Sequence, residues 1–408
     1  MTHQTTPSVP ATAASTDIGR RAAVTFVVLL GVVSLFADMT YEGARGITGP
    51  YLAVLGASAT IVGIVAGLGE LIGYGLRLVA GYLGDRTGRY WTITILGYAV
   101  NLLAVPLLAL AGRWELAALL MLAERAGKAI RTPVRDAMLS HATAATGRGW
   151  GFGLHEAMDQ TGALLGPLIV AGVLAGQGAY GTAFAVLLIP ALLALGVLLA
   201  ARARYPDPRG FEIAPAAPTG RGWPRAFWLY LGAAALIGAG YADFPLIAYH
   251  FERAAVVSDS WIPLFYAVAM GVDALAALGF GWLFDRIGLV VVVAATLMSV
   301  LFAPLVFLGG FWAALGGMIL WGVGMGAQES IVRAAVAGMV PVDRRGAAYG
   351  TFNAGFGVAW FLGSAVMGVL YDLSLPALIA FSVVLQVAAL PVLLVVSRRM
   401  RRREPARA

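Results

Sequence analysis

Twelve runs of mostly apolar residues follow one another along this 408-residue chain, and this pattern restricts its fold more than any other feature. An α-helix of about 20 residues crosses the roughly 30 Å hydrocarbon core of a bilayer. The runs occupy residues 22–46, 58–83, 91–111, 115–138, 149–175, 181–203, 226–249, 261–284, 289–308, 312–338, 346–371 and 375–397. The sequence therefore predicts an all-α membrane protein with twelve transmembrane helices.

The composition agrees with a membrane environment. Hydrophobic residues make up 60% of the chain and charged residues 12%, whereas about 25% of a soluble protein is charged. These few polar residues do not suffice to cover a water-soluble particle, so lipid is the expected surroundings. The chain has no Cys and four scattered His, and we therefore expect no disulfide, no metal site and no cofactor.

The net charge of +7 reflects the placement of the basic residues. They gather in alternate loops, and the opposite loops contain only Arg113 and Arg253. The richer side holds Arg20, Arg21, Arg86, Arg89, Arg148, the basic residues of 202–225, Arg286, Arg344, Arg345 and those of 398–403. By the positive-inside rule, this side is cytoplasmic. The expected location is the cytoplasmic (inner) membrane with both termini inside, and nucleic-acid binding is a poor explanation of the charge.

The chain divides into two similar halves. Six apolar runs over 22–203 and six over 226–397 flank a polar linker, 204–225, which is rich in Pro, Gly and Arg. A polar N-terminus, 1–21, is expected to be disordered, and a basic tail covers 398–408. Gly81-Tyr-Leu-Gly-Asp-Arg-Thr-Gly-Arg89 recurs 200 residues later as Gly281-Trp-Leu-Phe-Asp-Arg-Ile-Gly288. Two parallel repeats of this kind predict a substrate path at their interface, near the bilayer midplane.

The segment Gly81-x-Leu83-x-Asp85-Arg86-x-Gly88-Arg89 resembles the signature loop of the major facilitator superfamily, and Gly281 to Gly288 is similar to its second-half copy. The resemblance implies two pseudo-symmetric six-helix bundles that transport solutes by alternating access. It also implies a conformational lock, in which charged residues hold the cytoplasmic ends of neighbouring helices together in one state. The alternative is a simple Gly turn whose charges mark the end of a helix. The residues expected there are Gly81, Asp85, Arg86, Gly88, Arg89, Arg135, Asp285 and Arg286.

The fifth run contains Gly153, Gly162, Gly166 and Pro167, and it resembles a helix-kink motif of proton-driven antiporters. Val170 and Ala171 stand where the family pattern has two Gly. The resemblance favours export, and the alternative is ordinary packing through small residues.

Charged residues within the runs indicate where protons would bind. The runs contain ten carboxylates and seven basic groups, so not every carboxylate can form an ion pair. A buried carboxyl group binds a proton more readily than one in water. The candidates for proton coupling are Asp38, Glu42, Glu124, Arg125 and Asp159. Arg125 matches a family position implicated in coupling. Asp38 lies about 16 residues, or roughly 24 Å, into the first run, which predicts a site beyond the midplane, shared with Glu42 and Glu124. The alternative is a set of structural ion pairs such as Glu42–Arg45.

Other polar and aromatic residues are candidates for the substrate cavity, although the aromatic ones are more often packing residues or interfacial anchors. They are Tyr41, Glu70, Tyr74, Tyr241, Asp243, Asp273, Trp321, Glu329, Asn353 and Trp360. The chain lacks the sequence motifs of nucleotide binding and of nucleophilic or metal-dependent catalysis, so we expect a carrier and not an enzyme.

We therefore predict a monomeric exporter of small molecules that exchanges its substrate for protons, with the proton gradient as its energy source. Uptake by symport is an alternative that uses the same architecture. A membrane sensor that binds a ligand without transporting it is a second alternative.

Overall fold

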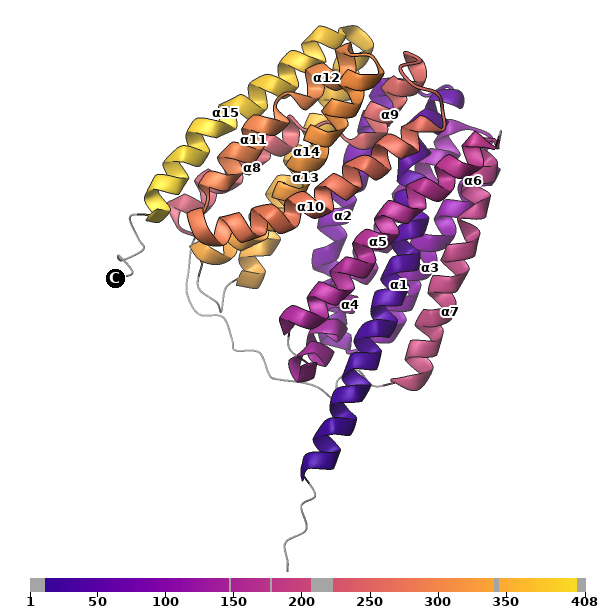
Figure 1. The fold of residues 1–408 in the computed structure, drawn as a ribbon, viewed down its shortest axis with the longest axis vertical. Helices are drawn as coiled ribbons and strands as arrows, with labels where there is room; N and C mark the ends of the chain where they lie inside the picture. The colour runs from indigo at the N-terminus through magenta and orange to yellow at the C-terminus, as the bar shows by residue number, and fades with distance from the viewer. Residues whose placement is uncertain (1–11, 147, 177, 207–222, 341–344, 402–408) are drawn as a thin grey trace, which may run out of the picture.

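The computed structural model describes residues 12–401 apart from 147, 177, 207–222 and 341–344; within helices some side chains, including those of Asp85, Asp285 and Glu329, lie outside the described residues. All regular structure in the described part is helical, which confirms the predicted fold class (Figure 1).

The first half contains six crossings. They are α1 (Thr12–Val54), α2 (Ala59–Thr87), α3 (Tyr90–Leu107) with the short turn η1 (Leu108–Leu110), α4 (Trp114–Thr146), α5 (Arg148–Ala175) and the pair α6 (Tyr180–Val186) and α7 (Leu188–Arg204). Helix α1 continues through Pro50 to Val54, eight residues beyond the predicted end of the first run, because the intervening residues remain mostly apolar.

The second half repeats this arrangement with six further crossings. They are α8 (Arg225–Ala239) with α9 (Phe244–Arg253), α10 (Trp261–Ile287), α11 (Val290–Ser299) with α12 (Phe302–Leu308), α13 (Phe311–Met339), α14 (Arg345–Leu373) and α15 (Leu375–Arg401). Where two helices share a crossing, the helix is interrupted within the span, a feature that apolar runs do not reveal.

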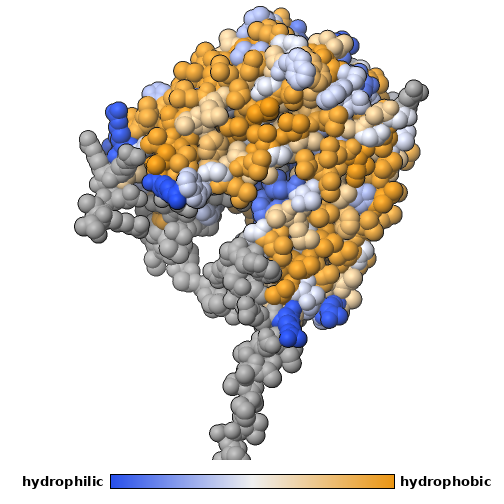
Figure 2. Space-filling model, in the orientation of Figure 1, coloured by the Kyte–Doolittle hydropathy of each residue, from blue (hydrophilic) through white to orange (hydrophobic). Residues whose placement is uncertain are grey.

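The surface of the bundle suits lipid. Within the described part of the chain, ten crossings are long and apolar enough to span a bilayer by length and composition alone. Helix α4 is not among them because it carries Glu124, Arg125, Lys128 and Arg131 within two turns. Large apolar side chains such as Leu275 and Leu278 of α10 are exposed, and Figure 2 shows hydrophobic residues over most of the visible surface.

The two copies of the repeated loop form the same kind of helix end. Gly88 after α2 and Gly288 after α10 both have positive φ, at +62° and +66°. The Gly88 N–H donates to the carbonyl of Gly84 at 2.9 Å, and the Gly288 N–H donates to that of Phe284 at 2.8 Å. Gly88 is in the left-handed helical conformation, with ψ of 11°, whereas Gly288 has ψ of −149°. Glycine adopts a positive φ of either kind without steric penalty, which explains its recurrence at both positions.

The two halves meet at one end of the molecule and separate at the other. We call the end where α1 begins and α7 and α15 finish the terminal face, and the opposite end the distal face (Figure 1). Near the distal face, Gly49 of α1 packs against Pro245 of α9 so closely that a Cβ would collide with the Pro245 carbonyl. Gly63 of α2 packs in the same way against α14. Figure 2 shows hydrophilic residues within a hollow between the halves on the terminal side, so this conformation opens toward the terminal face.

Candidate functional site

Five charged side chains of alternating sign form a row, here called the charge row, that runs from the second half into the first. Its order is Asp243, Arg45, Glu70, Arg125 and Glu124. Arg45 Nη2 lies 3.6 Å from Asp243 Oδ1 and 3.2 Å from Glu70 Oε1. Arg125 Nη1 lies 3.7 Å from the same Glu70 oxygen, and its Nε lies 3.4 Å from Glu124 Oε2. Asp243 is the member of the row that belongs to the second half.

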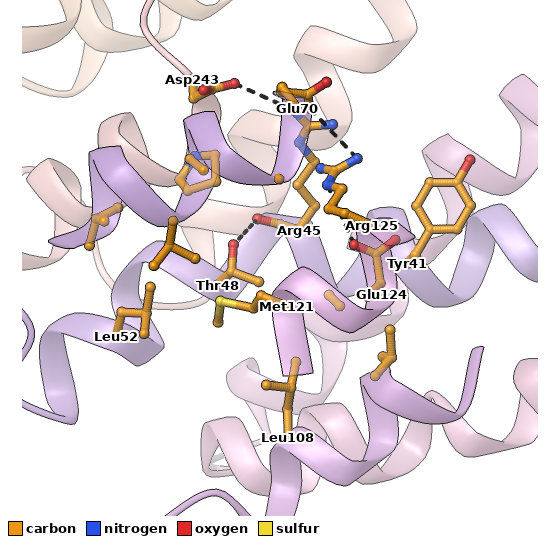
Figure 3. Close-up of a pocket in the computed structure, with 17 residues that line it drawn as sticks. Tyr41, Arg45, Thr48, Leu52, Glu70, Leu108, Met121, Glu124, Arg125 and Asp243 are labelled. Carbon is orange, nitrogen blue, oxygen red and sulfur yellow. Dashed lines mark hydrogen bonds and ion pairs between the residues drawn. The ribbon is translucent and has the colours of Figure 1, made fainter. Parts of the chain in front are cut away.

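The charge row lies in the wall of a cavity of about 570 Å³, here called the central cavity. Apolar residues of α1, α2, α3, η1 and α4 form much of the remaining wall. They include Leu52, Val62, Val65, Ala66, Val105, Leu108 and Met121. Figure 3 shows Leu52, Met121 and Leu108 apart from Asp243 and Glu70, so the cavity has a charged side and an apolar side.

The charged side lies at mid-depth in the membrane. Arg45 is nine residues before the end of α1, and Glu70 and Arg125 are each eleven residues after the start of their helices. At 1.5 Å per residue, these positions lie about 14–17 Å from the distal helix ends. That depth is half of a roughly 30 Å hydrocarbon core.

Asp243 is positioned by the break between α8 and α9, where it occupies the N-cap of α9. Its Oδ2 accepts hydrogen bonds from Trp360 Nε1 at 3.0 Å and from Ser364 Oγ at 2.7 Å, both on α14. These two donors fix the carboxylate so that Oδ1 is directed toward Arg45. The interrupted helix thus brings a charge of the second half to the central cavity.

A second ionic contact lies one turn toward the terminal face on α1. Lys128 Nζ of α4 is 3.4 Å from Glu42 Oε1, and the same ammonium lies 3.8 Å from the centre of the Tyr41 ring. Tyr266 of α10 donates its hydroxyl to Glu42 Oε2. Glu42 therefore also connects the two halves, and Arg45 pairs with the charge row and not with Glu42.

A third contact lies a further turn along both helices. Arg131 of α4 is 1% exposed; it donates from Nη1 to Tyr98 Oη at 3.0 Å and from Nε to Asn101 Oδ1 at 3.3 Å. Its Nη2 is 3.9 Å from Asp38 Oδ1. Among the described residues, no donor makes a hydrogen bond to Asp38 Oδ1 or to Asp159 Oδ1, although both oxygens are buried.

Asp38 lies about 16 residues, or roughly 24 Å, before the distal end of α1, so it is on the terminal side of the charge row and not beyond the midplane as the shorter predicted run implied. It does not line the central cavity, whereas Glu124 does. A Cβ at Gly162 of α5 would lie 3.0 Å from Asp38 Cβ, so Asp38 packs against α5 one turn from Asp159. Contacts between α1 and α4 connect this carboxyl pair to the cavity.

The glycine motif of α5 serves close packing. A Cβ at Gly162 would collide with the carbonyl of Leu35, and one at Gly166 with that of Met39, both on α1. Pro167 lies within α5, which runs without interruption from Arg148 to Ala175, and a Cβ at Gly153 would meet open space.

The residues of the expected lock are only partly described. Arg86 donates to the Tyr82 hydroxyl at 3.1 Å, and the Arg286 guanidinium lies 3.3 Å from the Trp282 ring centre. Arg135 binds Asp136 at 2.8 Å and Ser34 at 2.9 Å within the first half. Gly81 lies beside Pro133, and the Arg89 N–H donates to Thr87 Oγ1 at 3.3 Å. The side chains of Asp85 and Asp285 lie outside the described residues, so the lock remains a prediction.

The other expected cavity residues fall into two groups. Tyr41, Glu70 and Asp243 line the central cavity, together with Glu124 and Arg125 from the proton-coupling candidates. Trp360 reaches the cavity indirectly, through Asp243. The residues away from this cavity are Tyr74, Tyr241, Asp273, Trp321 and Asn353. Tyr241 donates to the Trp321 carbonyl within the second half, and the side chain of Glu329 lies outside the described residues.

Several residues of the site were not predicted. The sequence suggests Arg45 only as a structural partner of Glu42, because its place at the centre of the charge row depends on tertiary contacts. Tyr266 and Ser364 carry no local sequence signal because each acts through one contact across helices. Among the described residues, no group of three or more His, Asp or Glu is arranged to hold a metal ion.

A twelve-crossing bundle of two similar halves, with a charged cavity between its helices, is the architecture of a membrane transporter. Residues 27–327 match the family profile of the Major Facilitator Superfamily, and the chain belongs to this family, whose members are transporters and not enzymes.

Relatives of this chain occur in mycobacteria and archaea. It is 44% identical over 372 residues to uncharacterized proteins of Mycobacterium tuberculosis and Mycobacterium bovis, covering 90% of this chain and 91% of theirs. It is 36% identical over 140 residues to an uncharacterized MFS-type transporter of Methanocaldococcus jannaschii, covering 34% of this chain and 35% of that protein.

Solved transporters share the fold at low sequence identity. A POT family transporter in complex with 5-aminolevulinic acid superposes with a TM-score of 0.75 at 14% identity, covering 92% of this chain and 96% of that chain. The nucleoside transporter NupG superposes with a TM-score of 0.71 at 13% identity, covering 92% of this chain and 99% of that chain. These similarities establish the fold and leave the substrate to be argued from the site.

Proposed function

We propose that this chain exports a small molecule across the cytoplasmic membrane in exchange for protons, with both termini in the cytoplasm. The central cavity receives the substrate, and the carboxyl groups of Asp38 and Asp159 receive the proton. The basic residues of the terminal face support the orientation through the positive-inside rule. In this orientation the described conformation takes up substrate from the cytoplasm.

The observation that carries the proposal is the pair of buried carboxylate oxygens without a hydrogen-bond donor at Asp38 and Asp159. A buried carboxylate is stable only when its charge is well compensated. Arg131 approaches Asp38 to no closer than 3.9 Å, and its Nη1 and Nε donate to Tyr98 and Asn101 instead. A proton is therefore a suitable ligand for this carboxyl pair.

A series of ionic contacts between α1 and α4 connects the proton site to the cavity. Asp38 faces Arg131, and Glu42 faces Lys128 one turn further along both helices. Another turn further, the charge row joins Arg45 to Arg125 through Glu70. Neutralising Asp38 changes the charge balance along this series, including Glu42, which contacts Tyr266 of the second half. Proton binding thereby alters the relative stability of the two states in alternating access.

Export is favoured over uptake by the close contact between α5 and α1 at Gly162 and Gly166, in the segment that resembles an antiporter motif. A symporter would use the same carboxyl groups and the same cavity. A sensor would bind its ligand without moving it. These alternatives differ in measurable flux.

The test uses liposomes that contain the purified protein and are loaded with the small-molecule extract of a bacterial cytoplasm. Retained solutes are measured by mass spectrometry, and protein-free liposomes are the control. Exchange for protons predicts that acid outside accelerates the loss of particular solutes, irrespective of the orientation of the inserted protein. Faster loss with acid inside would indicate symport, and loss that ignores the gradient would contradict proton coupling. If the protein causes no loss of any solute, the sensor is the remaining alternative.

A further inference from the structure

The charge row contains an ion pair that a substrate can replace. Arg45 and Asp243 face each other across the two halves at 3.6 Å, which is longer than the 3.2 Å contact of Arg45 with Glu70 in the same half. Asp243 Oδ2 is held by Trp360 and Ser364, while Oδ1 faces the cavity wall. The Asp243 side is therefore rigid, and its open oxygen is an acceptor for a cationic group.

The Arg45 side offers a donor that is not yet used. Among the described residues, the buried Nε–H of Arg45 has no hydrogen-bond acceptor. Its Nη2 is shared between Glu70 and Asp243. A carboxylate binds a guanidinium most strongly through two parallel hydrogen bonds. A carboxylate entering the cavity can accept from Nε while it takes the place of Asp243 at the guanidinium.

The balance of charges restricts the ligand. A purely anionic solute that takes Arg45 leaves Asp243 buried without its partner. A purely cationic solute that takes Asp243 removes one partner of Arg45 and enters beside two guanidinium groups. A buried charge that loses its partner is strongly unfavourable. A zwitterion supplies both partners at once and leaves no charge unpaired.

We propose that the central cavity binds a small zwitterionic solute whose ammonium group pairs with Asp243 and whose carboxylate pairs with Arg45. The solute takes the place of the direct ion pair and connects the two halves. Leu52, Leu108 and Met121 form an apolar wall beside the charges, so the solute carries an apolar side chain.

The inference rests on the proposed transport through this cavity, and it deepens that function by naming the chemical class of the substrate. A ligand that contacts both halves has different affinities in the two states, because the contacts with Asp243 and Arg45 cannot both persist when the halves rearrange. This difference is what a substrate needs in order to shift a conformational equilibrium.

The test measures binding, not flux, with the full-length protein in lipid nanodiscs. The ligands are phenylalanine and the dipeptide phenylalanyl-leucine, each also as the N-acetyl form, the C-terminal amide and the doubly blocked form. Isothermal titration calorimetry should show that at least one free zwitterion binds tenfold or more tightly than each of its blocked forms. Equal affinity for a blocked form, or no binding of either zwitterion, would overturn the inference.

Two substitutions locate the two ends of the ligand. Asp243→Asn keeps an acceptor for Trp360 and Ser364 and should abolish the preference for a free amino group, so that the zwitterion and its N-acetyl form bind alike. Arg45→Gln should abolish the preference for a free carboxylate over the amide. Glu115→Gln, at an exposed carboxylate in the first turn of α4, is the matched control and should keep both preferences. A variant that keeps the preference it should lose would contradict the assignment.

The two proposals fail separately. Solutes of another charge class that leave extract-loaded liposomes under a proton gradient, with no binding of zwitterions, would sustain proton-coupled export and refute this inference. Selective zwitterion binding without gradient-driven loss of solutes would support this inference and refute proton-coupled export.

Discussion

The distal closure depends on a carboxylate of the second half that caps a helix of the first half, and its removal should open the distal face. Asp372, at the end of α14, accepts hydrogen bonds from the backbone N–H groups of Ala59 and Thr60 at 3.2 and 2.8 Å. It also accepts from the Thr60 hydroxyl at 2.6 Å. These groups form the N-terminus of α2, where a negative charge is favourable.

The size of the effect follows from these contacts. Replacing a capping side chain by alanine costs about 0.5–2 kcal/mol, and hydrogen bonds to a charged group contribute about 1.5–3 kcal/mol each when buried. The Thr60 contacts are exposed, so solvent reduces this second contribution. We expect Asp372→Ala to destabilise the distally closed state by about 1–2 kcal/mol, which shifts the equilibrium about 5–30-fold toward the distally open state.

The chain has no cysteine, so pairs of cysteines can be introduced for spin labelling without first removing native ones. Val54→Cys with Ala254→Cys places labels on the two halves at the distal face. Arg204→Cys with Arg398→Cys does the same at the terminal face. Pulsed electron–electron double resonance in nanodiscs should show that Asp372→Ala has a larger population of long distances between the distal labels. It should also show a matching population of short distances between the terminal labels.

The control is Glu115→Gln, which changes a distal carboxylate of α4 within the first half. It should leave both distance distributions as they are in the parent protein. If Asp372→Ala also leaves them unchanged, the cap at the start of α2 does not hold the distal face closed, and our account of the closure is wrong.

Two further predictions concern packing and orientation. Gly49→Ala places a methyl group against the backbone of α9, so we expect the same long distal distances as in Asp372→Ala. Gly75→Ala is the control, because a Cβ there meets open space, and it should leave the distances unchanged. Equal behaviour of the two variants would contradict the packing argument. Reporter fusions at residue 215 should be cytoplasmic and those at Ser258 external, and the reverse result would overturn the orientation derived from the basic residues.

The fold could be predicted because each membrane helix is encoded by a local run of apolar residues. Each crossing needs about 20 apolar residues, and the two Gly-terminated loops near residues 88 and 288 mark the internal repeat. The interruptions within three crossings were not predicted, because the apolar runs continue on both sides of each break. Helix α1 extends past the predicted end of the first run and through Pro50, because membrane helices tolerate proline.

The candidate site could be predicted in its residue types but not in its pairings. Charges on α1 and α4 at helical spacing drew attention to Asp38, Glu42 and Glu124. Spacing alone would also pair Glu42 with Arg45. In the packed structure, Glu42 pairs with Lys128, and Arg45 pairs with members of the charge row. Such choices depend on the rotation of each helix against its neighbours, which a single sequence does not contain.

The most direct test of proton-coupled export compares the parent protein with Asp38→Asn in liposomes loaded with the cytoplasmic extract. The amide keeps the size of the side chain but takes up no proton near neutral pH. Solute loss at equal pH on both sides should persist in part, while its acceleration by acid outside should disappear. Glu115→Gln should retain the acceleration. Full acceleration in Asp38→Asn would contradict our account and move the proton site elsewhere.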